Sequence, residues 1–60
     1  MNYPFAINYR VAGSGTLVLN CISRAEADLY AEIIREDGSI DKALLIERRG
    51  LFGVCIAHIK

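Results

Sequence analysis

Residues 42–60 read KALLIERRGLFGVCIAHIK, and this C-terminal third decides the predicted fold. Two apolar segments, 42–48 and 51–59, flank a short stretch, 48–50, that ends in Gly50. This pattern is typical of a β-hairpin with residues 48–50 at its tip. Apolar residues occupy both alternating faces of each segment, whereas a strand with one face in water keeps polar residues there. We therefore expect this hairpin to need cover on both faces.

Segment 42–48 has a second interpretation. The three large aliphatic residues at 44–46 do not distinguish a strand from a buried helix by their period. Ser39 and Gly50 would suit the two ends of such a helix. We favour a strand because segment 51–59 is β-like and needs a neighbour.

The first 22 residues predict another hairpin. Apolar and polar or small residues alternate from Tyr3 to Val11, which is the period of a half-buried strand. Gly13-Ser14-Gly15 suits a tight turn, and residues 16–22 form the expected return strand. The face that we expect to meet water carries Asn8, Arg10, Thr16 and Asn20.

A helix is predicted between the two hairpins. Ser23 and Glu26 have the spacing of a capping box, in which each side chain bonds the backbone near the other residue. Gly38 is typical of the left-handed residue that ends a helix. The stripe expected to be buried contains Leu29, Tyr30, Ile33 and Ile34.

These elements predict one α+β domain over residues 1–60. The order strand, strand, helix, strand, strand implies a mainly antiparallel four-stranded sheet with the helix packed on one face. One helix shields one face, so an apolar patch should remain uncovered and bind a protein partner or a second copy. We predict that this patch contains Leu44, Ile46, Phe52, Val54 and Ile56. Arg48 and Arg49 are expected at its rim, because arginine and aromatic residues often dominate interface energy.

Size and charge narrow the functional classes. Sixty residues, 53% of them hydrophobic, make a small core, and association with a second copy would extend it, so we expect a homodimer. Seven basic residues balance seven acidic ones, so bulk charge does not favour nucleic acid or an acidic membrane. Segment 23–37 nevertheless holds an acidic set, Glu26, Asp28, Glu32, Glu36 and Asp37. This set is either a solvated helix face or a mimic of nucleic acid that fits a basic groove.

The sequence offers no catalytic arrangement. Cys55 and His58 are three residues apart, which in a regular strand places them on opposite faces and disfavours a nucleophile–base pair. The two cysteines and one histidine lack the paired spacing of a zinc site, so we expect no metal, no cofactor and no enzymatic activity. Cys21 and Cys55 are interpreted as packing residues with reduced thiols. The N-terminus resembles no secretory signal and no run could span a membrane, so we expect a cytoplasmic protein.

In overall design, the chain resembles small phage- and plasmid-encoded inhibitors of bacterial defence, notably anti-CRISPR proteins. The likeness lies in the short chain, the strand–strand–helix opening from Tyr3 to Asp37, the lack of catalytic residues and the surplus of binding surface. It implies an inhibitor or regulator that docks on a larger, nucleic-acid-handling bacterial complex, and it assigns no role to individual positions. The alternative is a small nucleic-acid-binding protein or toxin–antitoxin component. Its basic hairpin tip would use Arg48, Arg49, Lys42, His58 and Lys60.

Overall fold

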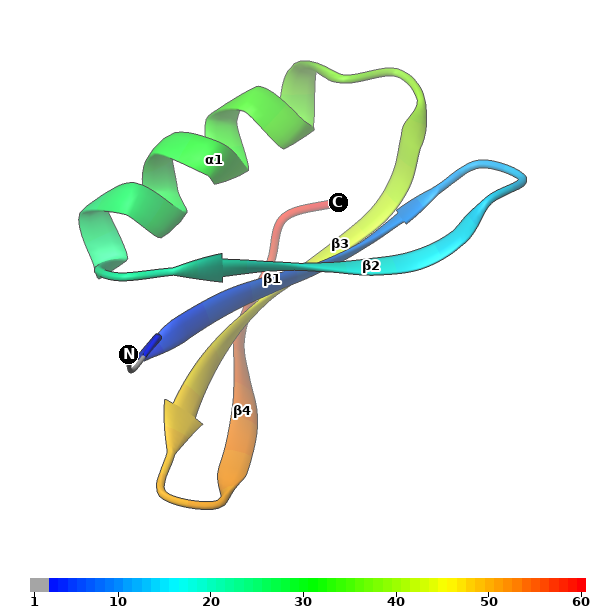
Figure 1. Ribbon diagram of the computed structural model, residues 1–60. Helices are drawn as coiled ribbons and strands as arrows, with labels where there is room; N and C mark the ends of the chain where they lie inside the picture. Colours follow the sequence, from blue (N-terminus) through cyan, green and yellow to red (C-terminus); the bar gives the residue numbers. More distant parts are fainter. Residues whose placement is uncertain (1–2) are drawn as a thin grey trace.

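The computed structural model describes residues 3–60, and its elements follow the predicted order (Figure 1). They are β1 (Phe5–Val11), β2 (Gly15–Cys21), α1 (Arg24–Glu36), β3 (Ile40–Arg49) and β4 (Phe52–His58). The strands form one sheet in the order β2-β1-β3-β4, and all neighbours are antiparallel. The predicted α+β fold is confirmed, and residues 42–48 belong to a strand.

The first hairpin is regular over its whole length. The seven residues of β2 pair with the seven of β1 without a register shift, from Phe5 opposite Cys21 to Val11 opposite Gly15. In the turn, the backbone N–H of Ser14 donates to the carbonyl oxygen of Val11 at 2.9 Å. Gly13, at the third position, has φ of 81°, as a type II turn requires.

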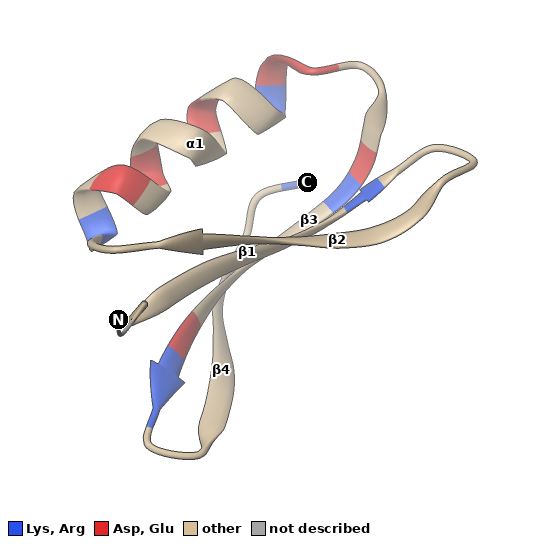
Figure 2. Cartoon of the chain, viewed as in Figure 1, with Lys and Arg blue, Asp and Glu red and all other residues tan. Residues whose placement is uncertain are grey.

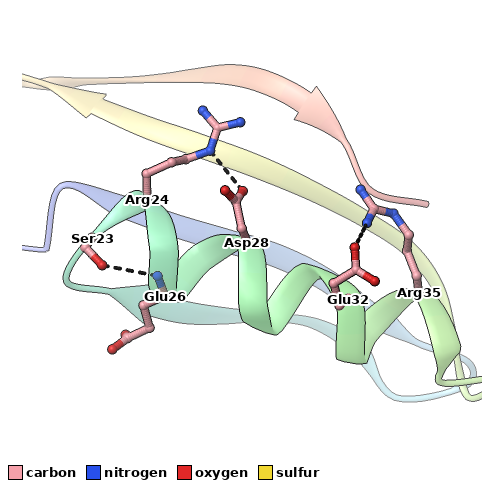
Figure 3. Close-up of polar contacts among 6 residues, drawn as sticks. All are labelled: Ser23, Arg24, Glu26, Asp28, Glu32 and Arg35. Carbon is pink, nitrogen blue, oxygen red and sulfur yellow. Dashed lines mark hydrogen bonds and ion pairs between the residues drawn. The ribbon is translucent and has the colours of Figure 1, made fainter.

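The start of α1 has the predicted capping box (Figure 3). The Ser23 hydroxyl accepts from the backbone N–H of Glu26 at 3.1 Å. The Glu26 carboxylate accepts from the backbone N–H of Ile22 at 3.3 Å. A capping box usually takes this bond from the N-cap residue, which is one position later. Two of the unpaired backbone donors around the helix start are thereby satisfied.

The end of α1 differs from the prediction. Gly38 does not have a positive φ; instead Asp37, after the last helical residue Glu36, takes an extended conformation with ψ of 108°. The Asp37 carboxylate accepts from the N–H of Ser39 at 2.9 Å and from its hydroxyl at 2.6 Å. These two bonds lower the pKa of Asp37. An aspartate turn therefore ends the helix where a left-handed glycine was expected.

The core lies between α1 and the sheet face that carries Ile7 and Leu45. The helix contributes Ala27, Ala31 and Ile34 to it, with Tyr30 packed against the cluster. The predicted stripe is therefore half wrong, because its other two members, Leu29 and Ile33, are exposed. Alanines let the helix backbone approach the sheet closely, and the two larger side chains are turned away. We call the sheet face opposite α1 the outer face.

The second hairpin turns one residue later than predicted. Arg49 pairs with Phe52, so the loop consists of Gly50 and Leu51, and Arg48 and Arg49 belong to β3. Gly50 has φ of 61°, while Leu51 does not have a positive φ. This is the pattern of a type II′ turn, in which glycine occupies the first central position.

A β-bulge changes the faces of β4. Leu45 pairs with Ala57 and Ile46 pairs with Cys55, which leaves Ile56 as the extra residue. One extra residue reverses the alternation of side chains beyond it. Relative to the residues before the bulge, those after it therefore lie on the face opposite to the one that simple alternation predicts.

Candidate functional site

The five apolar residues predicted to form one patch are divided by the pairing of β3 and β4. Leu44 and Ile46 lie on the outer face, where their cross-strand partners are His58 and Cys55. Ile56, the bulge residue, packs against the buried cluster instead. A single continuous patch is therefore not present.

On the outer face, one residue of the predicted patch packs directly over a glycine. A Cβ atom on Gly53 would lie 2.9 Å from Cγ2 of Ile46, so the side chain of Ile46 lies directly over the Gly53 backbone. Ile46 and Leu44 are both half-buried. These two residues consequently stabilise the second hairpin rather than project from it.

The remaining apolar residues form an exposed tip. Leu51 is 100% exposed, Phe52 75% and Val54 36%, and we call these three residues the apolar tip. Helix α1 contacts β1, β2 and β3 but not β4, and the end of the β3–β4 hairpin projects away from it (Figure 1). The backbone N–H of Arg48 still bonds the chain before β1, at Pro4. Beyond that point the hairpin extends past β1, which leaves the apolar tip uncovered.

The two arginines next to the tip have different roles. The Arg48 guanidinium crosses the outer face, donating to the carbonyl oxygen of Tyr3 at 2.8 Å and to Oδ1 of Asn20 on β2 at 2.7 Å. Arg48 therefore braces β3 against β2, away from the rim. Arg49 bonds Glu47 on its own strand at 2.6 Å. The guanidinium of Arg49 is the one that borders the apolar tip.

The basic residues of the nucleic-acid alternative do not gather. Lys42 and His58 lie at the opposite end of the second hairpin from Arg48 and Arg49. Lys42 and Arg48 are six positions apart along β3, a distance of about 20 Å. Lys60 follows β4 and donates to backbone carbonyl oxygens near the start of β3. Figure 2 shows the positive charges at separate ends of the sheet.

The outer face also has a shallow recess of about 260 Å³, whose lining is mainly polar residues. It is lined by Asn8, Tyr9, Arg10, Thr16, Lys42 and Leu44. Arg10 is engaged there by Asp41, which accepts from Nε at 2.9 Å and from Nη2 at 3.1 Å. This ion pair lowers the pKa of Asp41. The Arg10 guanidinium in the recess is therefore already paired, and residues 3–60 contain no cluster of three metal-ligating side chains.

The acidic set on α1 is largely engaged within the helix (Figure 3). Asp28 pairs with Arg24 at 3.0 Å, and Glu32 pairs with Arg35 at 2.9 Å. Glu26 belongs to the capping box already described. The surface available to imitate a row of phosphates is therefore smaller than the sequence suggests.

The two thiols lie in different environments. Cys21 is fully buried, and this burial raises its pKa. Cys55 is exposed on the outer face, so its interpretation as a packing residue is wrong. The cysteines lie on the two edge strands, three strand spacings or about 14 Å apart, which is too far for a disulfide.

The bulge also corrects the predicted arrangement of Cys55 and His58. Because it reverses the alternation, both residues lie on the outer face. The Cys55 thiol contacts the carbonyl oxygen of Ala57 at 3.6 Å. Lying on one face does not make the two residues a catalytic pair. Within residues 3–60, no hydrogen bond joins the Cys55 side chain to the His58 side chain.

Sequence reasoning missed most of the exposed apolar residues. Leu51 could have been identified, because a leucine directly after the turn glycine has no neighbouring strand to pack on. Leu29 and Ile33 required knowledge of which helix side meets the sheet, and the residues on β2 and at its end required knowledge of which strand forms the edge. Eight large apolar residues are exposed in residues 3–60, in two groups. The first is the apolar tip, and the second, on β2, its end and α1, comprises Leu17, Val18, Ile22, Leu29 and Ile33.

No helix in residues 3–60 has the length and apolar character needed to span a membrane. Comparisons with protein-family models, with curated proteins and with solved structures find no match for this chain.

Proposed function

We propose that the protein is a non-enzymatic binding module that docks on a larger protein through its apolar tip. The observation that carries this proposal is the exposure of Leu51, Phe52 and Val54 on a hairpin that extends past the helix. Fully burying a large apolar side chain contributes about 1.5–3 kcal/mol, so exposing three of them forgoes stability in the free protein. Docking would recover that energy.

The shape and charge of the tip indicate the complementary surface. A two-residue turn makes a narrow end, which fits an apolar groove better than a flat surface. Arg49 borders the tip, and within residues 3–60 its ion pair is with Glu47 of the same strand. An acidic group at the rim of the groove would compete for this guanidinium. Phe52 pairs with Arg49 across the hairpin, and aromatic and arginine side chains are enriched at protein interfaces.

The target class follows from the resemblance to inhibitors of bacterial defence. We propose a larger, nucleic-acid-handling bacterial complex whose working groove is blocked by the inserted hairpin. The apolar tip is held by a tight turn, which suits insertion into such a groove. This part of the proposal rests on overall design alone. The nucleic-acid alternative is not developed further because its basic residues lie at both ends of the second hairpin.

The experiment is a comparison of affinity captures from bacterial lysate. The double variant Leu51→Ser/Phe52→Ser should lose the captured protein, because its tip has no apolar surface to bury. Leu29→Ser removes an apolar residue of α1 that is 62% exposed and should retain capture. Circular dichroism should show both variants folded.

Two results would overturn the proposal. One is undiminished capture by the tip variant. The other is direct binding of RNA or DNA at low salt that is lost in Arg48→Ala/Arg49→Ala, which would assign the protein to the nucleic-acid class.

A further inference from the structure

The second exposed apolar group includes Leu17 and Val18 of β2, an edge strand of the sheet. Edge strands of natural proteins are usually protected from pairing by lysine, proline or a bulge. Gly15–Cys21 contains no charged residue and no proline, and its register with β1 is unbroken. The other edge strand, β4, has the bulge at Ile56. β2 is therefore the unprotected edge, with Leu17 47% exposed and Val18 58% exposed on opposite faces.

We propose that β2 pairs antiparallel with β2 of a second copy about a twofold axis at Val18. Such a dimer would join two four-stranded sheets into one continuous sheet of eight strands. An axis perpendicular to the sheet keeps both α1 helices on the same face, and it must pass through a residue position because paired residues share a face. This proposal is independent of the apolar tip.

The sequence of β2 selects Val18 as the centre. With the axis there, Leu17 faces Leu19 of the second copy, and Thr16 faces Asn20 of the second copy. Apolar side chains then meet apolar ones, and the two polar side chains are within reach of each other. All seven residues of the strand take part.

Neighbouring registers match less well. An axis at Leu17 would place Thr16 against Val18, and an axis at Leu19 would place Val18 against Asn20. Each of these arrangements puts a polar side chain against an apolar one, and each shortens the overlap. Self-complementarity around one residue points to a second copy as the occupant of this edge.

The helix supplies further apolar surface on the same side. Figure 3 shows the Arg24–Asp28 and Glu32–Arg35 pairs on the side of α1 toward β3 and β4, and Glu26 on the opposite side, toward β2. Residues seven apart in a helix differ by only about 20° in direction. Ile33, seven residues after Glu26 and 57% exposed, therefore lies toward the β2 edge.

The spacing of the dimer leaves room for these side chains. In the joined sheet, the two β1 strands would be about 14 Å apart, three strand spacings. Helices in direct contact pack at about 8–10 Å, so the space between the two α1 helices needs filling. Ile33 and Leu17 of both copies are placed to occupy it. The dimer thus buries residues from both the edge strand and the helix.

A charge-swap experiment tests the pairing. Sedimentation velocity should show a dimer for the parent protein and a monomer for Val18→Lys, because the two lysines would face each other across the axis. Val18→Glu should also be monomeric. An equimolar mixture of the two variants should form a heterodimer. Phe52→Lys places the same charge on the apolar tip and should leave the parent dimer intact.

Hydrogen exchange supplies a second readout without substitution. Backbone N–H groups at alternate residues of β2 point away from β1, and dimerisation should slow their exchange as protein concentration rises. A parent protein that remains monomeric at its solubility limit would overturn the proposal. So would a dimer that survives Val18→Lys and is lost in Phe52→Lys, or variants that fail to associate when mixed.

Discussion

The two hairpins of this protein are similarly rich in apolar residues, yet the helix contacts both strands of the first and only one strand, β3, of the second. Ile7 and Cys21 of the first hairpin are fully buried. Phe52 and Val54 of the second lie on the same side of the sheet but are exposed, since α1 does not contact β4. Position relative to one helix of 13 residues, rather than hydrophobicity, decides which side chains form the core.

The turns of the two hairpins also differ in the size of the side chains that they expose. The first turn consists of small residues, Ala12 to Ser14, which is usual for an exposed loop. The second places Leu51 directly in the solvent. A large apolar residue in a two-residue turn contributes little to the stability of the free monomer. The comparison therefore separates a turn of small residues from a turn that leaves a large apolar side chain in solvent.

Alanine substitutions on the two hairpins should give the largest contrast. Ile7→Ala should cost about 2–5 kcal/mol of unfolding free energy, because it leaves a cavity in the core. Phe52→Ala should change that free energy by no more than about 0.5 kcal/mol, since the ring contacts solvent. Urea unfolding followed by circular dichroism measures both values. A cost for Phe52→Ala close to that of Ile7→Ala would place the tip within the monomer core.

The regular half of the molecule could be predicted from sequence. Alternation gave the faces of β1 and β2, and the Ser23–Glu26 spacing located the helix start, because both signals are local. The side of α1 that is buried could not be predicted. Two apolar stripes compete on this helix, and the one with small residues wins because Ala27 and Ala31 permit close packing against the sheet.

The faces of β4 could not be predicted because a bulge leaves no clear mark in a uniformly apolar strand. The sequence around Ile56 is apolar on both sides, so an inserted residue changes no visible pattern. The sequence consequently predicts one surface for the patch, whereas its residues are spread over two faces of the second hairpin. Its exposed part is confined to three residues, of which Leu51 was not predicted.

Gly53→Ala tests whether the outer face of the second hairpin is closely packed. The added methyl group would lie 2.9 Å from Cγ2 of Ile46, whose β-branched side chain has few alternative rotamers. We expect a loss of about 1–3 kcal/mol in unfolding free energy. The cost should shrink in an Ile46→Ala background, which removes that carbon. Equal costs in the two backgrounds would show that the contact does not cause the loss.

Gly50→Ala tests the type II′ turn that holds the apolar tip. Alanine at φ of 61° should cost about 1–2 kcal/mol. Gly38→Ala is the matched control, because Gly38 has no positive φ and neither glycine has a neighbour within 4 Å of an added Cβ. Any difference between the two urea midpoints therefore reports backbone conformation alone. A harmless Gly50→Ala would mean that the turn does not fix the tip.

Lowering the pH should change the stability least of all these tests, and it should act on the end of the sheet opposite the apolar tip. The Arg10–Asp41 pair joins β1 to β3 there, and the bond from Arg10 lowers the pKa of Asp41 in the folded protein. A lowered pKa stabilises the fold above the unfolded-state pKa of about 3.9. That contribution is lost as pH falls through the folded-state value. The urea midpoint should consequently fall between about pH 6 and about pH 3.

Asp41→Asn separates this carboxylate from Asp37, whose pKa is lowered by its bonds to Ser39. The variant should start from a lower midpoint near neutral pH and should fall less steeply in acid, because only Asp37 of the two still titrates. Both carboxylates are exposed, so solvent screens them and the change should be modest. An unchanged slope in Asp41→Asn would mean that the Arg10–Asp41 pair does not contribute to stability. The packing of α1 would then stabilise this end of the sheet without a contribution from the ion pair.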